Sequence, residues 1–164
     1  MNLALSEVST QNILNQLAES GQKTLGLLSQ ENIKFISLNK DHLVTLSEAD
    51  FKCLKVAKCL IQNNKSRYII FISFNEGNVY PFIKNYYNQE EITSEVCGEW
   101  SCEILNMIAG DLIGHFSNVQ SIKFDGEIPN LVLANDIKNL NRNNLVGSFG
   151  LMNNNRFSLD LYKL

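Results

Sequence analysis

The pattern of apolar and polar positions is clearest over residues 99–116, where it predicts the principal helix of the chain. Apolar side chains recur there in steps of three and four, which suits one face of a helix. They are Trp100, Ile104, Met107, Ile108, Leu112, Ile113 and Phe116. A second set with the same spacing, called the polar stripe below, consists of Glu99, Glu103, Asn106, Gly110 and Gly114. Residues so spaced lie one above another on a helix surface.

The composition of the polar stripe is unfavourable for a helix. In a helix interior, Asn costs a few tenths of a kcal/mol relative to Ala, and Gly costs about 1 kcal/mol. A helix face with two glycines either packs tightly against another backbone or stays low so that a partner can approach. An amphipathic core helix with a polar outer face has the same periodicity, so the spacing alone leaves both interpretations open.

The part of the chain before this helix is predicted to hold another long helix and at least one strand. In order, we expect a helix over 9–28 capped by Ser9 or Thr10, a short extended segment over 33–38, a loop or short turn over 39–50, a strand over 68–74, turn residues Gly77 and Asn78, and a short helix over 79–88 containing Pro81. Residues 51–61 are ambiguous, because lysines recur every three residues as in a helix while Val, Cys and Ile favour a strand.

The part of the chain after this helix is predicted to be mostly strands. We expect a strand over 121–124, a turn at Asp125-Gly126, an extended segment through Pro129 to Leu133, a polar loop over 135–144, and two strands over 145–151 and 157–162 around a turn at 152–156. Such elements form an α+β fold, with an antiparallel sheet and long helices packed on one face. No internal linker is evident, so residues 1–164 are expected to form a single domain.

Length, charge and cysteine content narrow the class of protein. A chain of 164 residues is long enough for one domain with a sizeable core. Its net charge is −3 and it has no cluster of five or more basic residues, which argues against nucleic acid as a partner. No apolar run approaches the roughly 18 residues that span a bilayer, and the N-terminus lacks the features of a signal peptide.

The four cysteines do not form a metal-binding pattern. None belongs to a C-x-x-C pair, and the two histidines, His42 and His115, stand far apart in the sequence. We therefore expect no metal site and reduced thiols in a cytoplasmic protein. His115, near the end of the principal helix, is expected to be solvated or to interact with the helix dipole rather than to act in catalysis.

Residues 103–110, Glu-Ile-Leu-Asn-Met-Ile-Ala-Gly, resemble the signature helix of the CheX/CheC family of chemotaxis phosphatases. The family pattern is an acidic or Ser residue, three positions, Glu, two positions, Asn, and then 22 positions and Pro. Glu103, Asn106 and Pro129 fit this pattern, and Glu99 falls where the family usually has Asp or Ser. The resemblance covers 99–129 in detail and 45–164 as an order of elements. It implies a CheX/CheC-like fold, in which 51–61 is the first strand of a hairpin.

The first helix carries a weaker echo of the same motif. Residues 12–18, Asn-Ile-Leu-Asn-Gln-Leu-Ala, resemble the run that begins at Glu103, and the CheC-type fold contains two similar halves. The echo is either a degenerate repeat or a coincidence. If it is a repeat, Asn12 stands where the Glu should be, and the chain carries one active helix.

The pairing of Glu103 with Asn106 suggests a specific chemistry. A carboxamide does not transfer protons readily near neutral pH, but it can hold a water molecule by accepting one hydrogen bond and donating another. This suits the hydrolysis of an already reactive phosphoryl group, such as an aspartyl phosphate, where the main task is to position the nucleophile. Glu103, one helical turn away, can pair with a Lys of a partner and set the register of docking.

The family resemblance implies the same arrangement. In that family, the signature helix inserts into the active site of a phosphorylated CheY-type response regulator in two-component signalling. Asn106 would orient the attacking water, Glu103 would contact the regulator's phosphate-binding Lys, Gly110 would keep the helix surface low, and Glu99 would be an accessory residue. The chain would need no cofactor of its own, because the regulator supplies the Mg²⁺. CheX proteins form homodimers through their sheets, so a homodimer is expected, with an edge of the hairpin over 145–162 as one candidate interface.

Two alternatives stay open. The chain can be a CheX-like binding module that docks receiver domains or dimerises without catalysis, and the change at Glu99 leaves room for this. It can also be structural, because the middle domain of the flagellar switch protein FliM shares the fold, but that domain lacks the Glu/Asn pair that this chain retains at Glu103 and Asn106. Other catalytic motifs, such as G-x-S-x-G or a Gly-rich phosphate loop, are absent from the sequence.

Overall fold

The computed structural model describes residues 8–42, 46–86, 92–152 and 154–164. The helices are α1 (Thr10–Ser29), α2 (Glu48–Lys52), α3 (Glu76–Ile83), α4 (Ser94–Gln120), α5 (Ala134–Lys138) and a 3-10 helix, η1 (Arg142–Asn144). The strands are β1 (Phe35–Ser37), β2 (Leu54–Gln62), β3 (Arg67–Asn75), β4 (Asp125–Gly126), β5 (Asn130–Val132), β6 (Leu145–Leu151) and β7 (Asn154–Lys163). The α+β class predicted from the sequence is confirmed.

One antiparallel sheet organises the chain, with the strand order β1-β6-β7-β3-β2-β4 and β5 also pairing with β2. The hairpin of β2 and β3 is its centre, and these strands pair without interruption from Leu54 opposite Asn75 to Gln62 opposite Arg67. Its turn is closed by the Asn63 side chain, which accepts hydrogen bonds of 2.9 Å from the backbone N–H groups of Lys65 and Ser66. This is the hairpin expected over 51–61 and 68–74.

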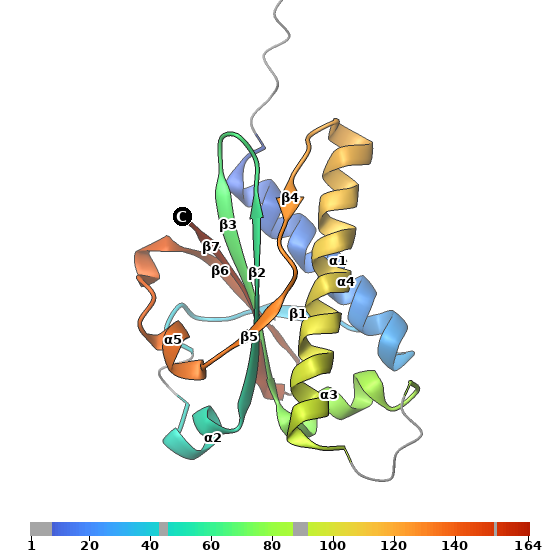
Figure 1. The fold of residues 1–164 in the computed structure, drawn as a ribbon, viewed down its shortest axis with the longest axis vertical. Helices are drawn as coiled ribbons and strands as arrows, with labels where there is room; N and C mark the ends of the chain where they lie inside the picture. Colours follow the sequence, from blue (N-terminus) through green and yellow to red (C-terminus); the bar gives the residue numbers. More distant parts are fainter. Residues whose placement is uncertain (1–7, 43–45, 87–91, 153) are drawn as a thin grey trace, which may run out of the picture.

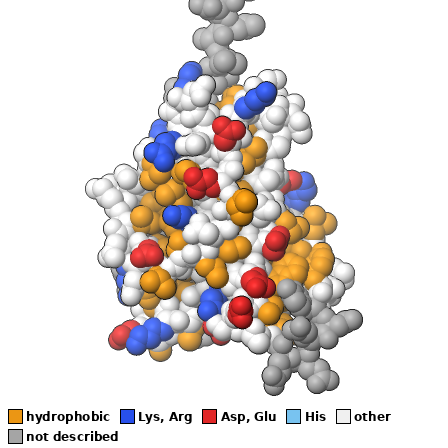
Figure 2. All heavy atoms as spheres, viewed as in Figure 1, with side chains coloured by type: hydrophobic (Ala, Val, Ile, Leu, Met, Phe, Trp, Pro, Cys, Tyr) orange, Lys and Arg blue, Asp and Glu red, His pale blue; other side chains and the backbone are white. Residues whose placement is uncertain are grey.

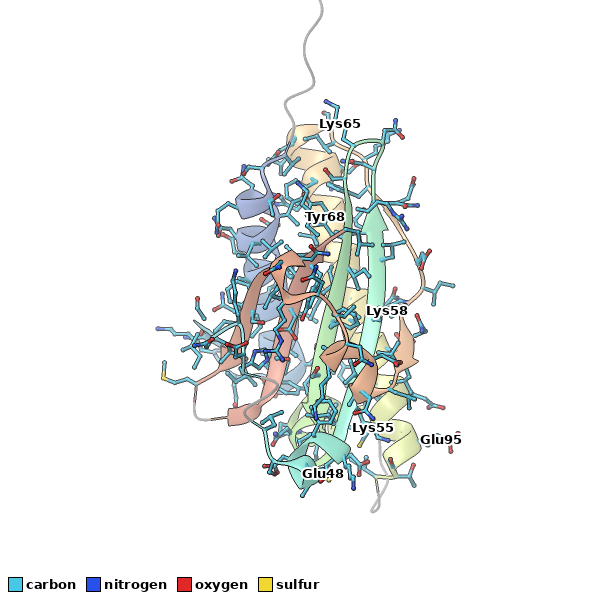
Figure 3. All side chains as sticks on the ribbon, turned by 90° about the vertical axis from the view of Figure 1, so that its left-hand side faces the viewer. Glu48, Lys55, Lys58, Lys65, Tyr68 and Glu95 are labelled. Atoms are coloured by element: carbon cyan, nitrogen blue, oxygen red, sulfur yellow. The ribbon has the colours of Figure 1, made fainter. Side chains whose placement is uncertain are left out.

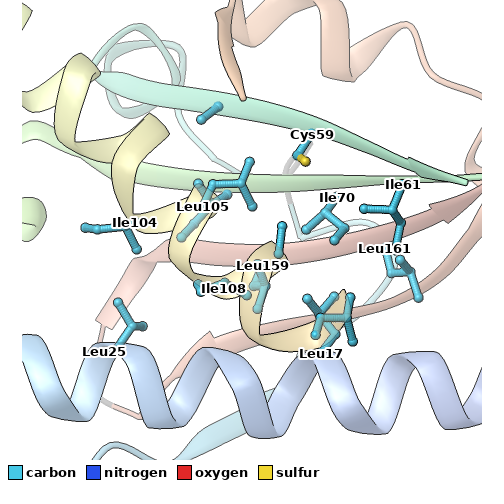
Figure 4. Packing of buried hydrophobic residues seen from close by; sticks show 14 of the residues in the cluster. Leu17, Leu25, Cys59, Ile61, Ile70, Ile104, Leu105, Ile108, Leu159 and Leu161 are labelled. Carbon is cyan, nitrogen blue, oxygen red and sulfur yellow. The ribbon is translucent and has the colours of Figure 1, made fainter. Parts of the chain in front are cut away.

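The long helices cover one face of the sheet, as predicted. Figure 1 shows α1, α3 and α4 on one side of the strands, and the short helices α2 and α5 on the other. On the covered face, Leu17 and Leu25 of α1 and Ile108 of α4 pack toward the sheet, as Figure 4 shows. Alternate residues of β2 contribute to the same core from the sheet side, namely Ala57, Cys59 and Ile61. Burial of these apolar surfaces holds α4 in place.

The opposite face holds a smaller apolar cluster and a buried polar group. The cluster consists of Phe51, Leu54, Val56, Phe71, Ile137, Leu145 and Tyr162. Beside it lies Asp160, which is fully buried and accepts hydrogen bonds from the hydroxyls of Ser148 and Ser158. Nε2 of His42 lies 3.7 Å from the carboxylate. Burial raises the pKa of Asp160, and His42 and the two hydroxyls oppose that rise.

Two predictions are wrong for the segment that follows α4. The predicted strand over 121–124 does not form, because α4 continues to Gln120 and Ser121 ends it in the left-handed conformation, with φ of 55°. The predicted turn at Asp125-Gly126 is instead strand β4, which pairs with Ile61 and Gln62 of β2.

Other corrections concern short helices. Ser47, in the segment expected to be a loop or short turn, caps α2 by accepting a hydrogen bond of 3.1 Å from the backbone N–H of Asp50, and β2 begins at Leu54. The loop expected over 135–144 contains α5 and η1. Gly77, expected to end the hairpin, lies in the first turn of α3, which contains Pro81. Residues 87–91, which include the end of the predicted helix over 79–88, lie outside the described residues, as does 153.

The hairpin expected to offer an exposed edge lies further inside the sheet. β7 lies between β6 and β3, and it pairs with β3 from Phe157 opposite Phe74 to Lys163 opposite Tyr68. On the outer side of β6, strand β1 pairs with residues 149–151. Strand β1 therefore covers residues 149–151 of the hairpin edge, and the use of this hairpin as a dimer interface stays a prediction.

Candidate functional site

Helix α4 presents the polar stripe at the surface. The helix begins after Thr93, whose hydroxyl accepts a hydrogen bond of 3.2 Å from the backbone N–H of Val96. It ends where the N–H of Ile122 donates to the carbonyl of Phe116, at 3.1 Å. Because its apolar face is buried against the sheet and α1, the opposite face points to solvent (Figure 1).

All four residues predicted for the site lie together on this outward face. Glu99, Glu103, Asn106 and Gly110 are exposed. Within the described part of the chain, Glu99, Glu103 and Asn106 make no hydrogen bond or ion pair. Their carboxylate and amide groups are therefore available to solvent or to a partner. A core helix with an ordinary polar outer face would not need glycines on that face.

The glycines of α4 differ in what surrounds them. A Cβ at Gly98 would come within 2.7 Å of Cδ1 of Leu131, so this glycine allows β5 to pack against the helix. A Cβ at Gly110 or Gly114 would meet nothing within 4 Å. The neighbouring Leu131 side chain therefore favours glycine at Gly98, whereas no internal contact favours glycine at Gly110 or Gly114, although each costs the helix about 1 kcal/mol relative to Ala.

Polar contacts between Asp111 of α4 and residues of α1, called the clamp below, fix the rotation of α4 about its axis. Asp111 accepts hydrogen bonds from Oγ of Ser20 at 2.7 Å and from Nζ of Lys23 at 2.5 Å. Burial alone would raise the pKa of Asp111, but the hydrogen bonds from Lys23 and Ser20 and the charge of Lys23 outweigh it and hold the pKa below its usual value. Because Ser20 is fully buried, the clamp leaves the helix little freedom to turn the polar stripe away from solvent.

The first turns of α4 are held by α3. The carboxylate of Glu76 accepts a hydrogen bond of 2.7 Å from the hydroxyl of Ser94 and lies 3.5 Å from Nζ of Lys55. Further along, the rings of Trp100 and Tyr86 pack with their centroids 5.2 Å apart. The N-terminal half of the polar stripe is thus flanked by an aromatic pair.

Pro129 and His115 pack within the fold and do not belong to the exposed polar stripe. Pro129 is buried and directly precedes β5, where Asn130 pairs with Lys58 of β2. His115 is half-buried, with its ring edge-on to Phe116 at 5.5 Å. Among the described residues, no group of three His, Cys, Asp or Glu side chains is placed to hold a metal ion.

The surface beside the stripe is hollowed on two sides. A shallow hollow of about 740 Å³ is lined by Leu28, Tyr86, Glu99, Trp100, Cys102, Glu103, Met107 and Leu131. A second hollow of about 560 Å³ lies where α1 and α4 meet, and its lining includes Gly110 and Gly114. Figure 2 shows acidic side chains following the lower part of α4, with apolar side chains beside them. Asn106 lines neither hollow.

Several of these features could not be found by sequence reasoning. Ser20 and Asp111 are 91 positions apart, and no local pattern links them. The aromatic pair and the contact of Gly98 with Leu131 likewise join separate segments. A weak signal existed for Asp111, since it is an acidic residue between the apolar positions Ile108 and Leu112.

Comparison with known proteins gives a fold and no sequence family. No family model matches the chain, and no curated protein matches it in sequence. In the described part of the chain, no helix has the length and apolar character needed to cross a membrane.

Solved structures do match over nearly the whole chain. The chemotaxis protein CheX from Vibrio vulnificus matches with a TM-score of 0.70 and 12% identity, covering 96% of this chain and 100% of that chain. A CheC-like superfamily protein from Shewanella sp. PV-4 gives 0.64 and 12%, covering 96% and 99%. The CheX–CheY–BeF₃–Mg²⁺ complex from Borrelia burgdorferi gives 0.61 and 14%, covering 92% and 97%. The CheX/CheC-like fold predicted from the signature helix is confirmed.

Proposed function

We propose that this chain, with its CheX/CheC-like fold, is a protein phosphatase that hydrolyses the aspartyl phosphate of a CheY-type response regulator. Asn106 orients the attacking water, and Glu103 docks the regulator. One observation carries the proposal: Glu103, Asn106 and Gly110 are exposed together on one face of α4, and the two side chains have no partner among the described residues.

The chemistry assigned to Asn106 is the positioning of water. Its carboxamide oxygen accepts a hydrogen bond from the water while its amide group donates to the phosphoryl group or to the regulator. An aspartyl phosphate is already reactive, so placing one water in line with the bond to be broken supplies much of the rate enhancement. An exposed helix face suits this role, since the amide must reach into the active site of another protein.

Glu103 and Gly110 serve docking. The Glu103 carboxylate, one turn from Asn106, forms an ion pair with the Lys that binds phosphate in the regulator. Gly110 and the open space around it let the regulator's surface approach the helix backbone. We assign the Mg²⁺ to the regulator rather than to this chain. The complex of Borrelia burgdorferi CheX with CheY, BeF₃ and Mg²⁺ supports a receiver domain as the partner.

The test is a phosphate-release assay on a panel of receiver domains phosphorylated with a small phosphodonor. The Asn106→Ala variant is expected to lose most of the acceleration seen with the wild-type protein, by about 10²-fold or more, since water positioning is a transition-state contribution. The Glu103→Lys variant is expected to weaken receiver binding by reversing the docking charge. Asn118→Ala, an exposed Asn on α4 outside the polar stripe, is the matched control. Undiminished phosphate release by the Asn106→Ala variant would contradict the proposal.

A second function is a binding module without catalysis. Glu99 favours it, because the polar stripe carries a longer side chain than the usual Asp or Ser at that position. In that case a beryllofluoride-activated receiver domain binds the chain, but the rate of phosphate release does not rise. We also propose a cytoplasmic homodimer from the family resemblance, and light scattering of the purified protein tests its oligomeric state.

A further inference from the structure

The polar stripe continues toward the N-terminus of α4 as a row of three carboxylates, called the acidic row below. Glu95, Glu99 and Glu103 follow one another at intervals of four residues and are all exposed. Figure 3 shows Glu95 projecting outward from the first turn of α4. With a rise of about 1.5 Å per residue, the row extends for about 12 Å along the helix. The three side chains form no ion pair with any described residue.

The acidic row is unfavourable for the isolated chain. Like charges four residues apart on a helix repel each other and destabilise it. Lys55 of β2 does not neutralise the row, because its Nζ lies 3.5 Å from the Glu76 carboxylate and is engaged there. Only Glu95, in the first turn, gains from the helix dipole, whose effect fades beyond that turn. Folding of this chain therefore does not explain why Glu99 and Glu103 both carry charge.

An apolar hollow adjoins the acidic row. Of its lining residues, Leu28, Tyr86, Trp100 and Met107 are apolar or aromatic, while Glu99 and Glu103 form its charged border. Met107 is 41% exposed and Tyr86 is 59% exposed, so apolar surface lies open to solvent at the hollow. Such surface bordered by charge is typical of a protein-binding site, where the apolar part supplies affinity and the charges supply orientation.

We propose that the acidic row and this hollow together select a receiver domain with two features. The first is a second basic side chain, about as far from the phosphate-binding Lys as Glu99 lies from Glu103. The second is an apolar side chain that enters the hollow. This inference rests on the proposed function and deepens it. Glu103 contacts the first basic group, Glu99 contacts the second, and Glu95 strengthens the attraction. Glu99 thereby becomes a determinant of partner choice.

Charge complementarity favours such a partner over other occupants. The phosphates of a nucleic acid or of an anionic lipid surface would be repelled by three carboxylates. A second copy of this chain has a net charge of −3 and would bring the same acidic row to a self-complementary interface. A basic protein surface is attracted, and its apolar side chain removes the exposed surface of Met107 and Trp100 from water.

The single tryptophan of the chain reports on the hollow directly. Trp100 lines it, and the sequence contains one Trp, so Trp emission of the complex with a receiver domain lacking Trp comes from this site alone. The probe is the receiver domain of the panel whose phosphate release the wild-type protein accelerates most, mutated to lack Trp where necessary and activated with beryllofluoride and Mg²⁺. Its Kd is measured from Trp100 emission in 50 mM and 300 mM NaCl.

Two variants separate the charge from the hollow. For Glu95→Gln/Glu99→Gln, Kd at the lower salt is expected to rise about tenfold, and the difference from wild type to shrink at the higher salt because exposed charges are screened. For Met107→Ser, Kd is expected to rise about fivefold at both salts, because lost apolar contact is not screened. Asp136→Asn, on α5 at the opposite face of the sheet, is the control and is expected to bind like wild type.

The outcomes distinguish this inference from the proposed function. If the Glu95→Gln/Glu99→Gln variant binds like wild type while Asn106→Ala loses phosphate release, the docking inference is wrong and the proposed function stands. If no receiver domain of the panel changes Trp100 emission or releases phosphate faster, both are wrong. A homodimer that Met107→Ser dissociates would also overturn the inference, because the hollow would then be occupied by a second copy.

Discussion

Helices α1 and α4 lie side by side on the same face of the sheet, yet their glycines serve different ends. A Cβ at Gly21 of α1 would come within 2.7 Å of the Phe35 ring and 2.9 Å of a Leu159 methyl group, so this glycine makes room for the core. A Cβ at Gly110 or Gly114 of α4 would meet open space. The comparison teaches that a glycine in a helix suggests function only after its internal packing has been examined.

Replacement of Gly21 by a large side chain is expected to have the largest effect on stability. The Gly21→Leu variant is expected to lower the free energy of unfolding by about 2–3 kcal/mol, because its side chain forces Phe35 and Leu159 from their positions. Urea denaturation followed by circular dichroism measures it. A loss below 0.5 kcal/mol would show that the core adjusts freely and that Gly21 is no better explained than Gly110.

Substitution of the open glycines should have the opposite sign. Gly110→Ala and Gly114→Ala are each expected to raise the free energy of unfolding by about 1 kcal/mol, through helix propensity with no steric cost. If Gly110 serves close approach, the Gly110→Ala variant should at the same time bind the receiver domain more weakly. Greater stability together with unchanged binding would remove Gly110 from the proposed site.

The clamp between the two helices can be probed by pH. Asp111→Asn is expected to lower the free energy of unfolding by about 1 kcal/mol at pH 7, through loss of the charge-assisted bonds from Ser20 and Lys23. The pKa of Asp111 is lowered in the folded protein, so its contribution is present above the ordinary carboxyl pKa and is lost as the pH falls below about 4. The variant should therefore lose less stability than wild type between pH 5 and pH 3. Parallel pH profiles would contradict this role.

The smallest expected effect concerns the asparagines of the two helices. Asn106→Ala should raise the free energy of unfolding by a few tenths of a kcal/mol, because Asn is the poorer helix former and Asn106 has no partner among the described residues. In α1, Asn15→Ala also loses the hydrogen bond of 2.9 Å from Gln11, so its net change should be close to zero. Thermal unfolding of both variants gives the difference. Destabilisation by Asn106→Ala would assign that residue a structural role.

Prediction from the sequence succeeded where the structure depends on local periodicity. The stripe at Glu99, Glu103, Asn106 and Gly110 follows from helical spacing alone, and burial of the opposite face then makes it exposed. The strand over 68–74 was recognisable from its β-branched and aromatic residues, which pair on both sides within the sheet.

Prediction failed where distant contacts decide. The Asn-rich segment over 135–144 reads as a loop, but burial of Ile137 against the sheet holds it as α5. Apolar residues over 121–124 suggest a strand, although Phe124 instead packs against Phe116 of α4. The clamp at Asp111 was beyond reach for the same reason, since Ser20 and Lys23 belong to another helix.

Asp160 has a consequence for how the chain reaches its fold. It alternates along β7 with Leu159 and Leu161, which belong to the main core, and in the native register it faces the opposite side beside Ser148. A slip of one residue between β7 and its neighbours would turn the carboxylate into the apolar core, away from Ser148, and would remove both leucines from that core. A misaligned pairing of β7 is therefore less stable than the native one, and Asp160 helps to specify the register of the C-terminal hairpin.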